Sequence, residues 1–141
     1  MIRILGILLT VIFAVISLFH LYWAMGGAFG RSVAVPSRGE TRAFEPSAGG
    51  TILVAFAFLL AIAVILGQLR LFGDIAPRWL FRWGTWAIAL IFFLRAVGEF
   101  RLVGFFKKVN DTPFAYWDTW LFSPLCLVIA IIAFILAYTD A

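Results

Sequence analysis

The chain has 141 residues, of which 65% are hydrophobic and only 13% are charged. A soluble domain has roughly 45–50% apolar and about 25% charged residues, so this composition excludes a water-soluble fold of the same size. The net charge of +4 is typical of Lys and Arg residues that flank membrane spans. Because no stretch has the spacing of a nucleic-acid-binding module, we expect one membrane-embedded domain, residues 1–141, that binds no nucleic acid.

Four apolar segments are each long enough to cross a bilayer as a helix. Each holds about 20 residues, which at about 1.5 Å per residue matches a hydrocarbon core roughly 30 Å thick. Lipid does not tolerate unpaired backbone groups, and the sequence has no alternating β-barrel pattern. The predicted fold class is therefore all-α, a polytopic membrane protein with four transmembrane helices in an antiparallel bundle. The predicted spans are residues 2–25, 51–71, 79–99 and about 118–138.

The first span resembles a signal peptide only superficially. Its apolar run is too long, and it ends in His20, Tyr22 and Trp23 rather than in a small-residue cleavage site. We therefore expect this span to be retained. Gly26 and Gly27 follow this span. We interpret them mainly as the end of the helix, and only secondarily as a place where the backbone could approach a ligand closely.

The three connections differ in character. Residues 26–50 form a 25-residue loop, rich in Gly, Pro and charge, that is long enough to fold over the helix ends as a lid or simply to be mobile. Residues 72–78 form a tight turn with Gly73, Asp74 and Pro77. Residues 100–117 are basic and aromatic without helical amphipathicity, which favours an interfacial segment held by aromatic side chains.

The fourth helix has two predicted starting points. Thr112–Pro113 and Ser123–Pro124 each match an N-cap residue followed by proline at the first helical position. The first start predicts a helix that is kinked or interrupted at Pro124, and the second predicts a separate short helix over residues 114–122. In both cases Pro124 has no N–H to donate, so a carbonyl near Trp120 loses its helical hydrogen bond.

An even number of spans places both termini on one side of the membrane. By the positive-inside rule, the counts of Lys and Arg favour a cytoplasmic long loop and external termini. No G-x-x-x-G run dominates a helix, so no dimer face can be assigned and a homo-oligomer stays open. The terminal side holds four cations (Arg3, Arg70, Arg78, Arg82) and the other side six (Arg31, Arg38, Arg42, Arg101, Lys107, Lys108).

Polar residues from three spans lie at one predicted depth. At about 1.5 Å per residue, His20 and Arg95 each lie roughly 24 Å along their helices, and Ser123 lies roughly 22 Å along the fourth helix from its far end. Charged groups in a span usually mark a function or a satisfied structural pair. We therefore predict a polar pocket at one membrane face. Its candidate ligand-binding residues are His20, Trp23, Arg95, Glu99, Arg101, Asp118 and Ser123.

Arg95 and Glu99 are four positions apart, which predicts a direct ion pair on one helical face. Glu99 also needs a cation because the dipole at a helix C-terminus disfavours an anion. Arg95 and Arg101 are the expected partners of an anionic head group, while Glu99 and His20 would set protonation or orientation. The favoured function is binding or translocation of a small amphipathic or anionic ligand, such as a lipid or an isoprenoid.

Two other functions fit the same residues. His20 and Glu99 are candidate catalytic groups of an intramembrane acid–base enzyme, for instance a lipid isomerase. Alternatively, the polar cluster is an ion-pair network that holds three helices together in a non-catalytic accessory subunit. The residue pattern alone does not decide whether the protein is an enzyme.

Other chemistries find little support. One His and one Cys do not make a metal coordination shell, so we expect neither a metal nor a cofactor. Ser123, His20 and Asp118 could be drawn as a hydrolytic triad, but no G-x-S-x-G motif is present, and Ser before Pro is better explained as a helix cap. Cys126 has no second cysteine for a disulfide and is typical of a small core residue.

Three segments resemble a known family. They are the run from His20 to Gly27, the run Leu94–Phe105 with Arg95, Gly98 and Gly104, and the run Asp118–Cys126. Together they resemble a bacterial family of small four-span membrane proteins known as domain of unknown function 3995. The resemblance implies four helices and a bacterial inner membrane, and it implies no activity. Where the family pattern has Asp, this chain has Glu99.

Overall fold

The computed structural model describes residues 1–139, and four long helices dominate that part of the chain. All four are long and apolar enough to cross a membrane, which confirms the predicted four-span fold. The first three are α1 (Ile2–Ala24), α3 (Ala48–Gln68) and α4 (Arg78–Val97). The fourth span is continuous from Pro113 to Tyr138 and combines α5 (Pro113–Trp117), a π-helical turn (Asp118–Phe122) and α6 (Ser123–Tyr138).

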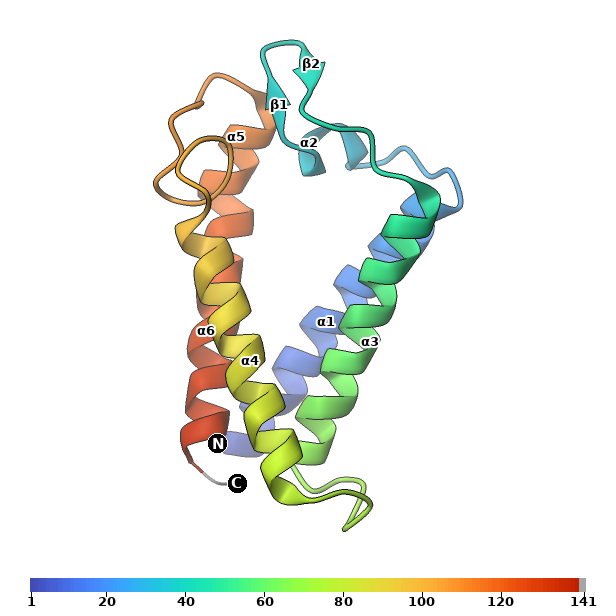
Figure 1. The fold of residues 1–141 in the computed structure, drawn as a ribbon, viewed down its shortest axis with the longest axis vertical. Helices are drawn as coiled ribbons and strands as arrows, with labels where there is room; N and C mark the ends of the chain where they lie inside the picture. Colours follow the sequence, from blue (N-terminus) through green and yellow to red (C-terminus); the bar gives the residue numbers. More distant parts are fainter. Residues whose placement is uncertain (140–141) are drawn as a thin grey trace.

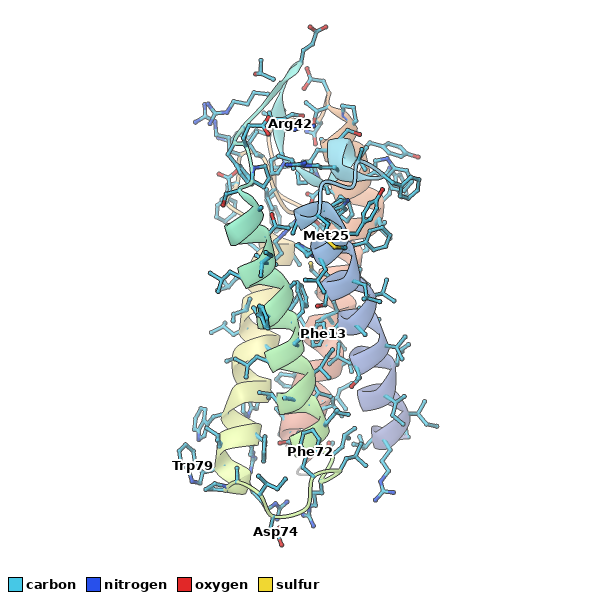
Figure 2. All side chains as sticks on the ribbon, turned by 90° about the vertical axis from the view of Figure 1, so that its right-hand side faces the viewer. Phe13, Met25, Arg42, Phe72, Asp74 and Trp79 are labelled. Carbon is cyan, nitrogen blue, oxygen red and sulfur yellow. The ribbon has the colours of Figure 1, made fainter. Side chains whose placement is uncertain are left out.

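The four spans form two pairs. Helix α1 packs mainly against α3, and α4 packs mainly against α6. The pairs meet at the end where α1 begins and α6 ends, and they diverge toward the opposite end (Figure 1). We call the end where α1 begins and α6 ends the terminal end, and the opposite end of the molecule the loop end. Figure 2 shows Asp74 and Trp79 at the terminal end and Met25 and Arg42 at the loop end.

Buried side chains form a core between the two helix pairs, from the terminal end to about the middle of the molecule. Phe13 of α1, fully buried, stacks against Phe92 of α4 at a ring-centroid distance of 5.5 Å, and its ring is tilted against that of Phe58 of α3 at 5.6 Å. Its side chain lies between the helices near the middle of the molecule (Figure 2). Nearer the terminal end, the buried amide of Gln68 donates a hydrogen bond of 3.1 Å to the Leu136 carbonyl, which joins α3 to α6.

The fourth span begins at the first of its two predicted starts. The Thr112 hydroxyl accepts the Ala115 N–H at 3.1 Å, and Pro113 occupies the first turn. Because Pro124 cannot donate to a carbonyl four residues earlier, the helix widens into the π turn before it, and the Ser123 N–H bonds the Asp118 carbonyl instead. The predicted interruption is therefore confirmed. The predicted capping role of Ser123 is wrong, because the helix runs through this residue.

The connections at the loop end contain short elements that the sequence pattern did not predict. Residues 25–47 include α2 (Arg31–Ala34) and a hairpin of β1 (Ser37–Arg38) and β2 (Thr41–Arg42). Helix α2 packs against α5, so this connection crosses from one helix pair to the other over the loop end (Figure 1). Helix α3 begins earlier than predicted because the Ser47 hydroxyl caps it by accepting the Gly50 N–H at 3.0 Å.

We predict that Phe13→Ala lowers the free energy of unfolding by about 3 kcal/mol or more, because it leaves a cavity where three spans meet. Thermal unfolding in detergent measures the effect. Phe56→Ala is the matched control, since Phe56 is 60% exposed on the outer face of α3. Equal losses of stability in the two variants would contradict this description of the core.

Candidate functional site

The carboxylate of Asp118 is the centre of the polar residues at the loop end. It is fully buried, accepts two hydrogen bonds and lies within ion-pair distance of two cations. Its Oδ1 accepts from Arg95 Nη2 at 2.9 Å, and its Oδ2 accepts from the Gly104 N–H at 2.8 Å and lies 3.2 Å from Lys107 Nζ. We call these four residues the Asp118 network. It joins α4, the 98–112 loop and the fourth span in one set of charged contacts.

Lys107 is the residue of this network that the sequence pattern missed. Its side chain is only 1% exposed, and its ammonium group also donates to the Gly104 carbonyl at 3.1 Å and to the Thr119 hydroxyl. The three contacts match the three donors of an ammonium group. In the sequence, Lys107 stands beside Lys108 in a basic loop, so no periodicity distinguished the buried lysine from the exposed one.

Two glycines explain why the loop reaches Asp118. Gly98 ends α4 with φ of +84°, and Gly104 has φ of +88°. Residues with a Cβ atom rarely adopt such positive φ angles. A Cβ atom on Gly104 would lie 2.3 Å from the Val97 carbonyl oxygen, so the two backbones are in direct contact. The Phe105 N–H then donates to the Ala96 carbonyl at 2.8 Å. The loop thus folds back onto the end of α4 and directs the Gly104 N–H at Asp118.

Two polar atoms beside Asp118 have no hydrogen-bond partner within residues 1–139. They are Nη1 of Arg95 and the hydroxyl of Ser123, and both atoms are buried. Buried polar atoms are normally partnered, because an unmade hydrogen bond costs about 1–3 kcal/mol. The Arg95 side chain as a whole is 32% exposed although its Nη1 is buried, whereas Ser123 is fully buried. Arg95 is therefore the member of the Asp118 network that another molecule can contact.

The predicted ion pair between Arg95 and Glu99 does not form. Helix α4 ends at Val97, and the positive φ of Gly98 turns the chain away before Glu99 is reached. Glu99 is exposed in the loop, where its carboxylate accepts the Leu102 N–H. The four-residue spacing predicts a shared face only while the helix continues, so Arg95 pairs with Asp118 instead.

The other predicted site residues lie outside the Asp118 network. His20 Nδ1 lies 2.8 Å from the Ile16 carbonyl, and the imidazole packs against Trp23 and Phe58 on the α1–α3 pair. Trp23 donates its indole N–H to the Phe29 carbonyl at 2.8 Å. Arg101 is exposed in the loop. The structure therefore brings Arg95 and Asp118 into contact, places Ser123 one turn after Asp118 on the same span, and leaves the remaining candidates outside this pair.

These positions limit the chemistry of the site. His20 lies on the other helix pair from Ser123 and Asp118 and is engaged with its own helix, so the three residues do not form a triad. Within residues 1–139, no group of three or more His, Cys, Asp or Glu side chains is arranged to hold a metal ion. What the arrangement offers is an arginine with a partly exposed side chain, paired with a buried carboxylate.

We predict that Asp118→Asn lowers the free energy of unfolding by roughly 3–5 kcal/mol, because it leaves two cations without their carboxylate. The substitution keeps the size of the side chain, so the lost charge is the main change. Asp111→Asn, at an exposed position of the same loop, is the matched control. Thermal unfolding in neutral detergent measures the effect. If both variants were as stable as the wild type, Asp118 would not be the residue that holds the network together.

Comparisons with known proteins give one match. The model of a family described as "Protein of unknown function (DUF3995)" matches residues 13–133, which include every member of the Asp118 network. No curated protein and no solved structure matches the chain. Since the match covers most of the chain and the structure has four apolar spans, this membrane protein belongs to the DUF3995 family.

Proposed function

We propose that this protein binds the anionic head of a small amphipathic molecule, a lipid or an isoprenoid-like compound, beside Arg95 at the loop end. The observation that carries the proposal is the charge balance of the Asp118 network. One buried carboxylate faces two cations, Arg95 and Lys107, so the network has one positive charge in excess. An excess charge in a low-dielectric interior is costly, and a singly charged anion would offset it.

Arg95 is the cation that meets the ligand. The ammonium group of Lys107 is buried and fully engaged by protein oxygens, so it cannot reach another molecule. Arg95 uses Nη2 for Asp118, while Nη1 has no partner among the described residues. A planar guanidinium group can hold a carboxylate with one edge and a second oxyanion with another. The Ser123 hydroxyl also lacks a partner, but it is fully buried and is therefore not available to that oxyanion.

The surrounding residues suit an amphipathic ligand. Phe92, one turn before Arg95 on α4, packs against Phe58, and Phe58 packs against His20. His20 and Trp23 therefore flank the loop end from the other helix pair, where they would contact the apolar part of the ligand. Arg101 lies in the exposed loop and would meet the part of the head group nearest water. Glu99 has no role in the proposal because its carboxylate accepts a loop N–H.

The alternative functions are less well supported. Acid–base catalysis requires His20 and Glu99 to act on one substrate, yet each is hydrogen-bonded within its own segment, to Ile16 and Leu102 respectively. An accessory subunit with a purely structural network is favoured by one observation, the two hydrogen bonds and two ion pairs within the protein that already satisfy Asp118. Under that alternative, changes at Arg95 alter stability and leave bound lipid unchanged. Translocation requires the same binding step.

The membrane spans and the distribution of charge support a proposal for the location in the cell. We propose a bacterial inner membrane with external termini, as the count of cations favours. The burial of Lys107 removes one of the six cations on the loop side from contact with lipid head groups. The remaining five still exceed the four on the terminal side.

Arg95→Gln tests the proposal. Asp118 keeps Lys107 and Gly104 as donors, so we expect the variant to fold. We expect the amount of bound anionic lipid to fall about tenfold or more relative to the wild type. This is the effect of losing a charged hydrogen bond of about 1.4 kcal/mol. Native mass spectrometry of protein purified in neutral detergent measures the bound lipid.

Arg82→Gln is the matched control, because Arg82 is an exposed arginine near the terminal end of the same helix. It should retain as much anionic lipid as the wild type. Equal retention in Arg95→Gln and wild type, with only a lower unfolding temperature in Arg95→Gln, would reject binding and favour the accessory-subunit alternative.

A further inference from the structure

We propose that the outer face of α1 holds one hydrocarbon chain of a membrane lipid in a groove of its own. The groove has a volume of about 430 Å³ and is lined by Val15, Leu18, Phe19, Tyr22 and Phe29. It shares no residue with the Asp118 network, so this inference is independent of the proposed function. A volume of this size lies within the roughly 300–1,000 Å³ typical of sites for small molecules.

The wall of the groove is one face of α1. Val15, Leu18 and Tyr22 recur at intervals of three and four residues, which places them on the same side of the helix. All three are exposed, whereas Phe13 and Ser17, on the opposite face, are buried against the other helices. The groove therefore opens toward the lipid.

The roof of the groove is Phe29, in the turn that follows α1. Gly26 and Gly30 have φ values of +96° and +74°, which allow the chain to reverse direction. A Cβ atom on Gly27 would lie 2.3 Å from the Tyr22 ring, so only glycine lets the turn pack down on that side chain. The glycines at positions 26, 27 and 30 thus place Phe29 over the exposed face of α1.

Two hydrogen bonds hold the roof in position. The Phe29 N–H donates to the Tyr22 hydroxyl at 3.3 Å, and the Trp23 indole N–H donates to the Phe29 carbonyl at 2.8 Å. Both polar backbone groups of Phe29 and the polar ends of two aromatic side chains are therefore used inside the turn. The ring of Phe29 stays 75% exposed. What faces the groove is almost entirely hydrocarbon, which suits an alkyl chain better than a polar ligand.

A single flexible chain fits the groove better than a protein helix does. Stable protein interfaces use roughly 20–30 residues a side, and only five line this groove. Phe29, in the connection after α1, also lines the groove, where its ring would obstruct a straight helix running alongside α1. In a bilayer the surrounding lipid is as apolar as the groove, so the chain is held by close packing against fixed walls rather than by exclusion from water.

Photocrosslinking tests the proposal. The protein is reconstituted in phosphatidylcholine vesicles that contain a small fraction of phosphatidylcholine with a diazirine on one acyl chain. This head group has no net charge, so labelling does not depend on Arg95. We expect the label to concentrate on residues 15–29. Leu18→Trp fills the groove and should lower that labelling about tenfold, the effect of losing roughly ten carbon–carbon contacts.

Leu60→Trp is the matched control, because Leu60 is 67% exposed on α3 and Leu18 is 64% exposed on α1. It should label as the wild type does. Tyr22→Phe removes the hydroxyl that holds Phe29 and keeps the ring, so it should also lower the labelling. Label spread evenly over the exposed faces of all four spans, or no change in Leu18→Trp, would overturn the proposal.

Discussion

A carboxylate that is buried in a membrane span must find partners within the protein, and most features of the loop end follow from this requirement. Asp118 obtains a guanidinium group from α4, an ammonium group from Lys107 and a backbone N–H from Gly104. The loop after α4 therefore has to fold back, which Gly98 and Gly104 permit. The same carboxylate determines the charge balance, because two cations for one anion leave a positive charge beside lipid.

The four spans were predictable because a membrane demands about 20 apolar residues in each helix, a signal that does not depend on packing. The interruption before Pro124 was also predictable, since proline has no N–H to donate. The form of the interruption, a π turn that begins at Asp118, was not. Nor were α2 and the small hairpin, because their short segments carry no clear periodicity. The pairing of α1 with α3 and of α4 with α6 depends on tertiary packing.

The level of the candidate site in the membrane could be predicted from the sequence, but which of its residues contact one another could not. The helical rise brought Arg95, Asp118 and Ser123 to one level, and the structure brings Arg95 and Asp118 into contact. The partner of Arg95 was wrong because helix α4 ends before Glu99. Lys107 was missed because burial of a loop lysine depends on a backbone fold that only the structure reveals. Charge and spacing thus indicated which residues share a depth, while the ends of the helices decided which of them meet.

The central claim is that the positive charge left by the Asp118 network is balanced by an anionic head group at Arg95. The most direct test is the unfolding temperature of the purified protein in neutral detergent, with a long-chain carboxylate or the alcohol of equal chain length. Because a ligand stabilises the folded state that binds it, the carboxylate should raise the unfolding temperature and the alcohol should not. An equal effect of the two compounds, or no effect of either, would contradict the claim.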